Sequence, residues 1–353
     1  MRVRKFIIIL SVLLCGIPAS AQYLYRLPPP KPVLSPTDTT EIFIIGDVMM
    51  HKAQLSHDCE YFLKYIEPHM QKADICIANM EFPLGGEPYS GYPAFSTPDW
   101  YAEYIARCGT DVFLVANNHV LDKGTKGLKR TMRVYDKMAD SLGIRYTGIG
   151  REPLILKRRG MRIALVNFTY GTNSLPGELN PDVLRMRESD VSHAIKSARA
   201  EGADFIVALP HWGTEYRLTH DDTQERWARW LVRQGCCAVV GAHPHVVQDT
   251  THINGVPVIY SLGNAVSNMS AENTRLELAV TLRFVHDFGT GDMYMLEPQL
   301  DFMWCTLPGR LTESYATIII KEWANRQSDW LTPSDFDNMM ATLERVKSAT
   351  GIR

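Results

Sequence analysis

The sequence predicts an α/β fold, because short apolar runs alternate along the chain with amphipathic segments of helix length. The runs are rich in Ile, Val, Phe and Ala and are apolar throughout, which is typical of strands covered on both faces. The chain has 353 residues, of which 45% are hydrophobic and 22% charged, so it is long enough for one large domain or two small ones. We therefore expect alternating strands and helices around a substantial core.

Seven apolar runs and five amphipathic segments provide the expected elements in chain order. The strands are expected within residues 41–50, 74–83, 111–120, 162–171, 204–213, 237–247 and 257–264. The helices are expected at about residues 58–72, 98–108, 125–142, 189–201 and 222–234. The last helix has signals at both ends, because Asp221 or Asp222 can cap its start and Gly235 follows its end.

The pattern changes after about residue 270, where partly alternating runs predict further strands. These runs cover residues 275–285, 292–304 and 316–323, and residues 332–350 predict a terminal helix. The additional strands would close a second sheet or flank the first. We place one main domain at residues 41–310 and a C-terminal extension, a β segment plus a helix, at residues 311–353.

The first 21 residues predict a secretory signal peptide. A basic start, MRVRK, precedes a short apolar core, and the small residues ASA end at Ala21, where cleavage is expected. The apolar core is too short for a comfortable membrane span, and Leu14 before Cys15 argues against a lipoprotein site. Residues 22–40 are rich in proline and predict an extended spacer. We therefore expect an exported protein, periplasmic or extracellular, without a transmembrane helix after cleavage.

Charge and cysteine content argue against some classes of protein. Cleavage after Ala21 would remove three of the 37 basic residues, leaving 34 against 39 acidic residues and a net charge of −5. A general nucleic-acid binder would usually have a basic surface, so no nucleic-acid partner is expected. Six cysteines would remain, and Cys76 and the Cys236–Cys237 pair lie in apolar runs, which favours buried free thiols. No CxxC motif occurs, which argues against a zinc ribbon or a thioredoxin-type site.

Side chains that can bind a metal follow nearly every apolar run. They are Asp47, Glu81, Asn118 with His119, His211, and the pair His243 and His245. Each one alone is more readily explained as a turn residue, a helix cap or a buried histidine, but five coincident strand ends favour a site. In α/β folds ligands bind at the carboxyl ends of strands, and His243 and His245 would share one face of an extended strand. Carboxylate, amide and imidazole ligands together suit Mn, Fe or Zn, and two such ions can hold a phosphate-like group and activate water.

Six motifs along residues 41–266 resemble, in order, those of a known family. They are GDVMM, NMEFPL, NNHVLDKG, HWGTEY, GAHPHVVQ and YSLGN. Their order resembles that of the calcineurin-like metallophosphoesterases, and the motifs themselves are similar to those of the CapA family, which is named for poly-γ-glutamate capsule synthesis. The resemblance implies a four-layer α-β-β-α sandwich, in which two sheets face each other and helices lie outside.

The resemblance also implies a role for each strand-end residue, with Glu81 as a carboxylate that bridges two metals. One metal position would add the ligands Asn118, His211 and His243. The other position would add the ligands Asp47 and His245. His119 would be the catalytic residue, protonating a leaving group or steadying the transition state. One or two divalent ions are therefore expected.

The sequence departs from the phosphoesterase pattern at two of these positions. Met49 stands where that pattern has a histidine ligand, and the bridging residue is Glu81 rather than an aspartate. Both changes are compatible with a weaker first metal position or with a single-metal site. His51 is in the wrong register to replace the ligand, and we interpret it as a surface histidine.

Two hypotheses about function follow from the resemblance. Glu215, Tyr216 and Asn264 lie in family motifs without a phosphoesterase counterpart, and we expect them to contact substrate, with structural packing as the alternative. The first hypothesis is an exported metal-dependent hydrolase or transferase that acts on a cell-surface polymer such as poly-γ-glutamate, or on its precursor, beside membrane-bound capsule-synthesis partners. The second is a non-catalytic module on the same fold that binds or exports an anionic polymer, motivated by the missing histidine at Met49.

Overall fold

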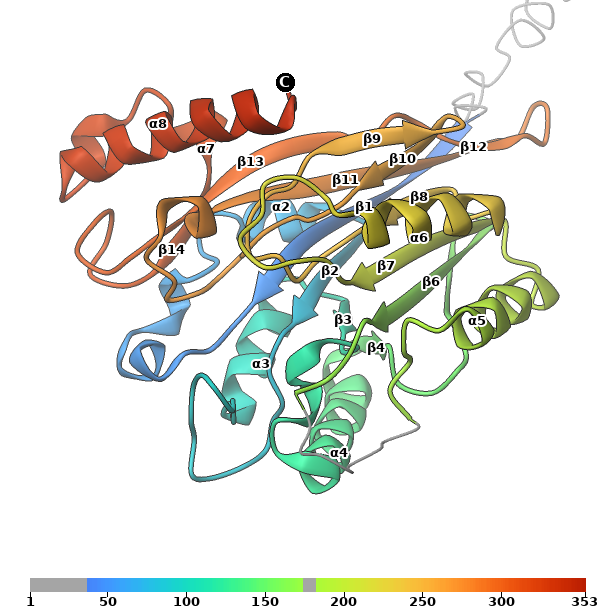
Figure 1. The fold of residues 1–353 in the computed structure, drawn as a ribbon, viewed down its shortest axis with the longest axis horizontal. Helices are drawn as coiled ribbons and strands as arrows, with labels where there is room; N and C mark the ends of the chain where they lie inside the picture. Colours follow the sequence, from blue (N-terminus) through green and yellow to red (C-terminus); the bar gives the residue numbers. More distant parts are fainter. Residues whose placement is uncertain (1–36, 174–181) are drawn as a thin grey trace, which may run out of the picture.

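Two β-sheets lie face to face in a computed structural model that describes residues 37–173 and 182–353 (Figure 1). The expected signal peptide and residues 22–36 of the expected spacer lie outside the described residues. Among the described residues, no helix is long and apolar enough to cross a membrane. The six cysteines that follow the expected cleavage site are all free thiols.

The larger sheet has eight strands in the order β14-β13-β11-β1-β2-β3-β4, with β12 paired to β11. Its strands are β1 (Thr37–Val48), β2 (Ile75–Met80), β3 (Val112–Leu114), β4 (Arg145–Thr147), β11 (Leu276–Asp287), β12 (Met293–Met295), β13 (Gln299–Thr306) and β14 (Ala316–Ile319). Strands β1 to β4 are parallel, whereas β11, β13 and β14 are antiparallel to their neighbours. The C-terminal strands therefore flank the first sheet, which is one of the two expected arrangements.

The sheet continues across both boundaries of the expected main domain. β1 begins at Thr37, so the last four residues of the expected spacer already pair with β11. β14 pairs with β13, so the expected boundary at residue 310 falls between two strands of one sheet. The division into a domain and an extension stays a prediction.

The smaller sheet has six strands in the order β5-β6-β7-β8-β10-β9. They are β5 (Leu154–Arg158), β6 (Met161–Thr169), β7 (Phe205–His211), β8 (Ala238–Val240), β9 (Thr250–Ile253) and β10 (Val256–Ile259). The four central strands are parallel, and β5 and β9 pair as antiparallel edges. All seven strands expected before residue 270 are confirmed, whereas β4, β5 and β9 were not anticipated.

The helices lie mainly on the outer faces of the sheets. They are α2 (Glu67–Lys72), α3 (Asp99–Arg107), α4 (Gly124–Leu142), α5 (Glu188–Ala200), α6 (Asp222–Arg233), α7 (Ile320–Trp323) and α8 (Pro333–Thr350). Short 3-10 segments are η1 (Lys52–Ser56), η2 (Cys59–Tyr61), η3 (Asn118–Leu121), η4 (Glu272–Arg275) and η5 (Gln327–Asp329). The single helix expected at 58–72 is wrong, because Pro68 is tolerated only in the first turn and α2 therefore starts at Glu67. The expected cap of α6 is Asp221, whose side chain accepts hydrogen bonds from Thr223 N and Gln224 N.

Three apolar clusters confirm the four-layer α-β-β-α sandwich. The central cluster lies between the sheets and includes Ile44 from β1 and Leu165 from β6. A second cluster joins the outer face of the larger sheet to α3 and α4, for example through Phe113 and Tyr135. The third joins the smaller sheet to α5 and α6, for example through Ile195. Both faces of each sheet are therefore covered, which explains why the strand sequences are apolar throughout.

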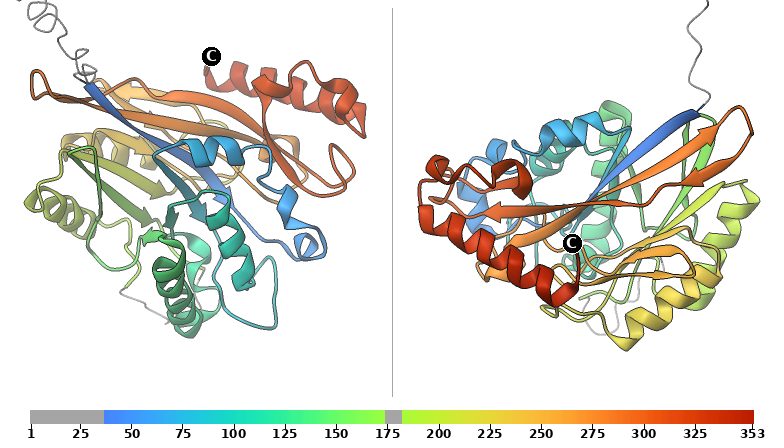
Figure 2. Two further views of the ribbon diagram at one scale, coloured as in Figure 1. Left: turned by 180° about the vertical axis from the view of Figure 1, so that it is seen from behind. Right: turned by 90° about the horizontal axis from the view of Figure 1, so that it is seen from above.

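Helix α8 covers the part of the larger sheet that extends beyond the smaller one (Figure 2). Its Phe336 and Met339 side chains join the central cluster. A buried ion pair attaches the helix as well, because both terminal nitrogens of Arg275 contact the Asp335 carboxylate, at 2.7 and 2.6 Å. The same guanidinium lies 4.3 Å from the ring of Trp304 on β13. The C-terminal helix is therefore an integral part of the core.

The parallel strands of both sheets point toward the same edge of the sandwich. Figure 1 shows the arrowheads of β1, β2, β6 and β7 directed the same way. The loops that follow these strands meet there, as expected for the ligand-binding edge of an α/β fold.

Candidate metal centre

Asp47 reaches the centre from an irregular position near the end of β1. The β1–β2 register shifts between Ile45 and Asp47, which is a bulge at Gly46. A side chain at residue 46 would not fit, because a Cβ there would lie 2.1 Å from Gly263 O. Gly46 N donates a 2.5 Å hydrogen bond to the buried Glu277 carboxylate. The glycine therefore lets the chain pass close to the Gly263 loop and orients the aspartate toward the other ligands.

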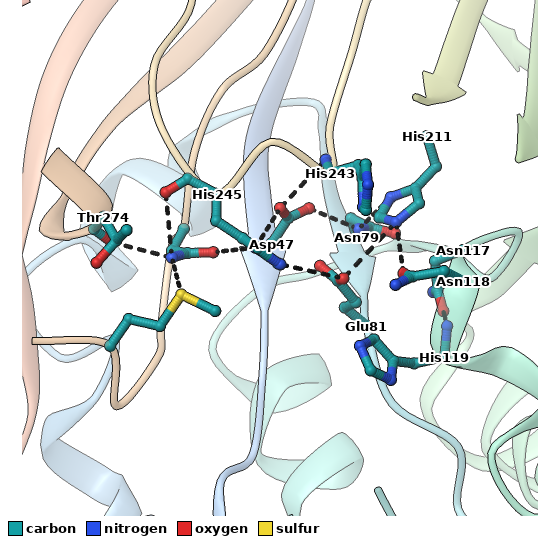
Figure 3. Close-up of polar contacts among 12 residues, drawn as sticks. Asp47, Asn79, Glu81, Asn117, Asn118, His119, His211, His243, His245 and Thr274 are labelled. Carbon is teal, nitrogen blue, oxygen red and sulfur yellow. Dashed lines mark hydrogen bonds and ion pairs between the residues drawn. The ribbon is translucent and has the colours of Figure 1, made fainter. Parts of the chain in front are cut away.

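Glu81 directly follows β2, and its carboxylate lies between His211 and His245 (Figure 3). Its Oε1 is 3.6 Å from His211 Nε2 and 3.8 Å from His245 Nε2. The side chain is completely buried, and neither carboxylate oxygen has a hydrogen-bond partner among the described residues. Burial raises the pKa of Glu81 well above its usual value, and the charge of Asp47 raises it further. A buried carboxylate without hydrogen bonds is costly unless a cation compensates it, so this residue fits a metal ligand.

His243 and His245 do not lie in a strand, because β8 ends at Val240. Their convergence instead comes from the turn that follows, where φ is +103° at His243 and +59° at His245. Such angles are unfavourable for residues with a Cβ and cluster at functional sites. The ring centroids are 5.9 Å apart, and both rings are buried. The two imidazoles therefore lie close together, as expected, but in a turn and not on one face of a strand.

The structure brings the predicted ligands together in overlapping groups. Within each group one nitrogen or oxygen from every residue lies within 4.8 Å of the others. The first group is Glu81, His211 and His243, and the second is Asp47, Glu81 and His245. Asn118 Oδ1 adds to the first group at 2.8 Å from His211 Nε2. These groups match the two predicted ligand sets, and their oxygen and imidazole donors fit a divalent metal.

Burial affects the three histidines differently. It lowers the pKa of His211 well below its ordinary value, with nearby His243 and His245 adding to the shift. It also lowers the pKa of His243 to about 3. For His245, burial alone would lower the pKa, but the hydrogen bond and charge of Asp47 and the Asn264 oxygen raise it instead. His211 and His243 are therefore neutral at neutral pH, which is the form that binds a metal.

His119 lies beside Glu81 on η3, at the end of the β3 loop. Its Nδ1 is 2.7 Å from Asp122 Oδ2, and both side chains are almost completely buried. The same Asp122 oxygen accepts a hydrogen bond from Phe95 N, and the Phe95 ring contacts the imidazole edge-on at 4.7 Å between centroids. The carboxylate therefore orients the ring and leaves Nε2 as the nitrogen that can hold or move a proton.

Within residues 37–173 and 182–353, neither Met49 nor His51 lies in one of these ligand groups. Met49 is buried in the apolar cluster beneath the larger sheet, so its side chain offers hydrophobic packing. His51 is half-buried rather than on the surface as expected, and its ring contacts Phe95 at 5.3 Å between centroids. Burial lowers the pKa of His51 to about 4. The position opened by Met49 is therefore not filled by His51.

The three expected substrate contacts have different surroundings. Glu215 and Tyr216 are exposed, and the Glu215 carboxylate forms a third possible ligand group with His243 and His245. Asn264 is completely buried, and its Oδ1 lies 2.9 Å from His245 Nδ1. Its Nδ2 donates to Thr274 O at 3.0 Å. The surroundings of Asn264 favour the packing alternative, because its amide supports the imidazole from behind.

Sequence reasoning missed two residues of the centre. Asn79 lies two positions before Glu81 on β2, and its Nδ2 donates to Asp47 Oδ1 at 2.7 Å. Tyr170 directly follows β6 and contacts His243, with ring centroids 4.7 Å apart. The sequence contains a signal for each. Asn79 is two positions from Glu81, and residues two apart share a strand face. Tyr170 follows the end of a strand, as the predicted ligands do.

Comparisons with known proteins identify similar chains and a similar fold. The capsule biosynthesis protein CapA of Bacillus anthracis is 28% identical over 312 residues, which cover 81% of this chain and 74% of that protein. The PGA biosynthesis protein CapA of Bacillus subtilis strain 168 is 27% identical over 277 residues, covering 74% and 72%. Among solved structures, a putative 5'-nucleotidase from Staphylococcus aureus has a TM-score of 0.51 at 13% identity, covering 74% of this chain and 54% of that one. This last similarity concerns the fold alone and spans about half of the nucleotidase.

A family sequence model assigns the chain directly. The model described as bacterial capsule synthesis protein PGA_cap matches residues 41–269, which is more than half of the chain. The matched region contains every predicted ligand, from Asp47 to His245, together with His119 and Asn264. The chain therefore belongs to the PGA_cap family of bacterial capsule synthesis proteins, is similar to the CapA proteins of Bacillus, and shares its fold with a putative 5'-nucleotidase.

Proposed function

We propose that this protein is a metal-dependent hydrolase or transferase that acts on a cell-surface polymer during capsule biosynthesis or processing. The observation that carries the proposal is Glu81, a buried carboxylate without hydrogen-bond partners that faces His211 and His245. Such an arrangement is unfavourable in a purely structural core and favourable around a divalent cation. Mn, Fe or Zn suits the mixed ligands, and the overlapping groups would accommodate one or two ions.

Each residue of the centre has a definite part in this proposal. The metal would be held by the six predicted ligands Asp47, Glu81, Asn118, His211, His243 and His245. When bound, it would polarise a substrate oxygen and make water more acidic. His119, oriented by Asp122, would donate a proton to the leaving group as the bond to it breaks. In hydrolysis, water would supply the hydroxyl group to one product and replace the proton that His119 gives to the other.

The family relationship supports the choice of substrate. The two Bacillus relatives are named for capsule and PGA biosynthesis. We therefore propose poly-γ-glutamate or its precursor as the substrate, cleaved or transferred at an amide, anhydride or phosphoester linkage. Export to the periplasm or cell surface, and partnership with membrane-bound capsule-synthesis proteins, belong to the same proposal.

A metal and activity assay tests the proposal. The protein would be purified without chelators, analysed for metal, and incubated with poly-γ-glutamate, whose chain length is followed by size-exclusion chromatography. We expect bound metal and shortened polymer in the wild type, loss of metal in His211→Ala, and loss of turnover in His119→Ala. His252→Ala is the control, because this exposed histidine pairs with Glu297 at the surface and belongs to no ligand group among the described residues. Protein without metal, and His211→Ala and His243→Ala variants indistinguishable from wild type, would reject the proposal.

A second function, binding of an anionic polymer without catalysis, is supported by a different observation. A groove of about 250 Å³ beside α6 combines three cations and two aromatic rings with one carboxylate, that of Glu188 at the start of α5. Its other lining residues are Arg226, Trp227, Arg229, Trp230 and Arg233, of which Arg229 also pairs with Glu225. Guanidinium groups bind carboxylates well, so this surface suits poly-γ-glutamate. We expect Arg226→Gln/Arg233→Gln to weaken salt-sensitive polymer binding more than the control Arg133→Gln/Arg158→Gln, which removes exposed charges elsewhere. Binding that survives chelation and the loss of His119, without any turnover, would favour this function over the first.

A further inference from the structure

The loop between β7 and α6 is attached to the turn that carries His243 and His245. Trp212 N donates to Ala242 O at 3.0 Å, just before the histidine pair. Tyr216 N donates to Pro244 O at 2.8 Å, and Pro244 lies between the two histidines. Two backbone hydrogen bonds therefore couple the position of this loop to the position of the imidazoles.

A second set of contacts fixes the far end of the same loop. Gln248 Nε2 donates to Arg217 O at 3.0 Å and to Thr219 O at 3.2 Å. Asp249 accepts a 2.8 Å hydrogen bond from His220 N, and its other oxygen lies 2.8 Å from the ring Nδ1 of His220. Residues 242–249 thus hold the backbone of the loop on both sides of the residue that lies between these anchors.

That residue is Glu215. Its carboxylate lies within 4.8 Å of a ring nitrogen of His243 and a ring nitrogen of His245, which are themselves within 4.8 Å of each other. His243 is only 3% exposed, and its buried Nδ1 has no hydrogen-bond partner among the described residues. Such a nitrogen is free to bind a ligand. Glu215 itself is exposed, so it approaches the buried pair from the solvent side.

We propose that Glu215 is a metal ligand that acts with His243 and His245 at the solvent side of the centre. The inference rests on the metal-dependent function proposed above and assigns to this residue a role in holding the ion. Two imidazoles and a carboxylate suit a divalent transition metal, and the buried pair provides the affinity while the exposed carboxylate faces solvent. A ligand on the solvent side would let the ion enter and leave without movement of the buried residues.

Metal titration tests the role without relying on catalysis. Mn²⁺ binding to the full chain would be measured by electron paramagnetic resonance and calorimetry for the wild type, Glu215→Gln and Glu297→Gln. Glu297 is a matched control, because it is an exposed carboxylate beside the single histidine His252. We expect Glu215→Gln to lose one bound ion or at least tenfold in affinity, and Glu297→Gln to match the wild type.

A change of ligand type provides an independent readout. Glu215→Cys should favour Cd²⁺ over Mn²⁺ and produce a sulfur-to-cadmium charge-transfer band absent from the wild type, because thiolates prefer softer metals. Wild-type Mn²⁺ stoichiometry and affinity in Glu215→Gln would overturn the inference. If that variant instead loses only polymer binding, Glu215 is a substrate contact and the ligand role is rejected. A wild type that binds no metal would reject the proposed function itself, which distinguishes the two failures.

Discussion

Removing the charge of the buried Glu81 carboxylate should raise the stability of the metal-free protein and lower that of the metal-bound protein, each relative to the wild type. Glu81→Gln keeps the shape of the side chain and removes its charge. In the metal-free protein the raised pKa of Glu81 means that the folded state retains a proton that the unfolded state has lost. The contribution of Glu81 to stability is therefore greatest below about pH 4.5 and decreases as the pH rises, by about 1.4 kcal/mol per pH unit while the folded state keeps the proton. Glu81→Gln lacks this loss and should be the more stable protein at pH 7 without metal.

Metal reverses the order of stability. A metal at a hundredfold excess over its Kd stabilises the folded state by about 3 kcal/mol. For a chain of this size, 1 kcal/mol corresponds to about 1.5 °C in Tm, so the wild type should gain about 4 °C with Mn²⁺. Glu81→Gln should gain little, because a neutral amide is a poor bridging ligand between imidazoles. The assay is differential scanning calorimetry of chelator-treated protein with and without Mn²⁺, at pH 6 and pH 8.

Glu277→Gln is the control for burial. This glutamate is also completely buried, and burial raises its pKa well above the usual value, but it contacts Gly46 N rather than the histidines. We expect its metal-dependent Tm increase to equal that of the wild type. A full Mn²⁺ shift in Glu81→Gln, or equal loss of the shift in both variants, would refute the reasoning.

Three further predictions concern the bulge, the oriented histidine and the C-terminal helix. Gly46→Ala should lose at least about 2 kcal/mol of stability and the Mn²⁺-dependent Tm increase, because a Cβ would meet Gly263 O at 2.1 Å. Asp122→Asn should lower turnover at least about a hundredfold with little change in Mn²⁺ affinity, because it no longer holds the correct tautomer of His119. Asp335→Ala should lose about 3–5 kcal/mol in urea denaturation, because it leaves its buried arginine partner without a counter-charge.

Matched variants show whether each effect is specific. Gly171→Ala places a Cβ in open space, and it should leave stability and metal binding unchanged. Asp136→Asn removes an exposed carboxylate that accepts a hydrogen bond from Tyr146, away from the candidate ligands, so turnover should not change. Asp337→Ala, on the same helix as Asp335, removes an exposed contact with Gln327 and should cost less than about 1 kcal/mol. A control as severe as its test variant would mean that the named contact is not the cause.

The sequence predicted the main strands and helices because their signals are local. A uniformly apolar run such as that of β7, or the capped amphipathic pattern of α6, needs no knowledge of distant residues. The strands that were not anticipated are short or partly exposed: β4 has three residues, and β5 and β9 are sheet edges. Such segments acquire their conformation from pairing with a neighbour, which a local pattern does not reveal.

The candidate ligands of the centre could be predicted from the sequence, whereas the residues that support them could not. Asp47, Glu81 and the histidines share a recognisable place after apolar strands, so their convergence follows from the α/β fold. The support depends on contacts between distant parts of the chain. Asn264 lies behind His245, and the approach of Glu215 to the histidine pair depends on a hydrogen bond from Tyr216 to Pro244. Neither contact has a periodic or compositional signature.

The position of β1 has a consequence for how the chain becomes functional during synthesis. The family match ends at residue 269, yet β1 pairs from Thr37 to Ile44 with β11, which lies beyond that point. Gly46 and its partner Glu277 are 231 residues apart in the chain. A nascent or truncated chain that ends before β11 would leave β1 as an exposed edge strand, prone to pair with other chains. The part that matches the family model therefore lacks the strand that pairs with β1, and we expect Asp47 to reach its final place only after β11 has been made.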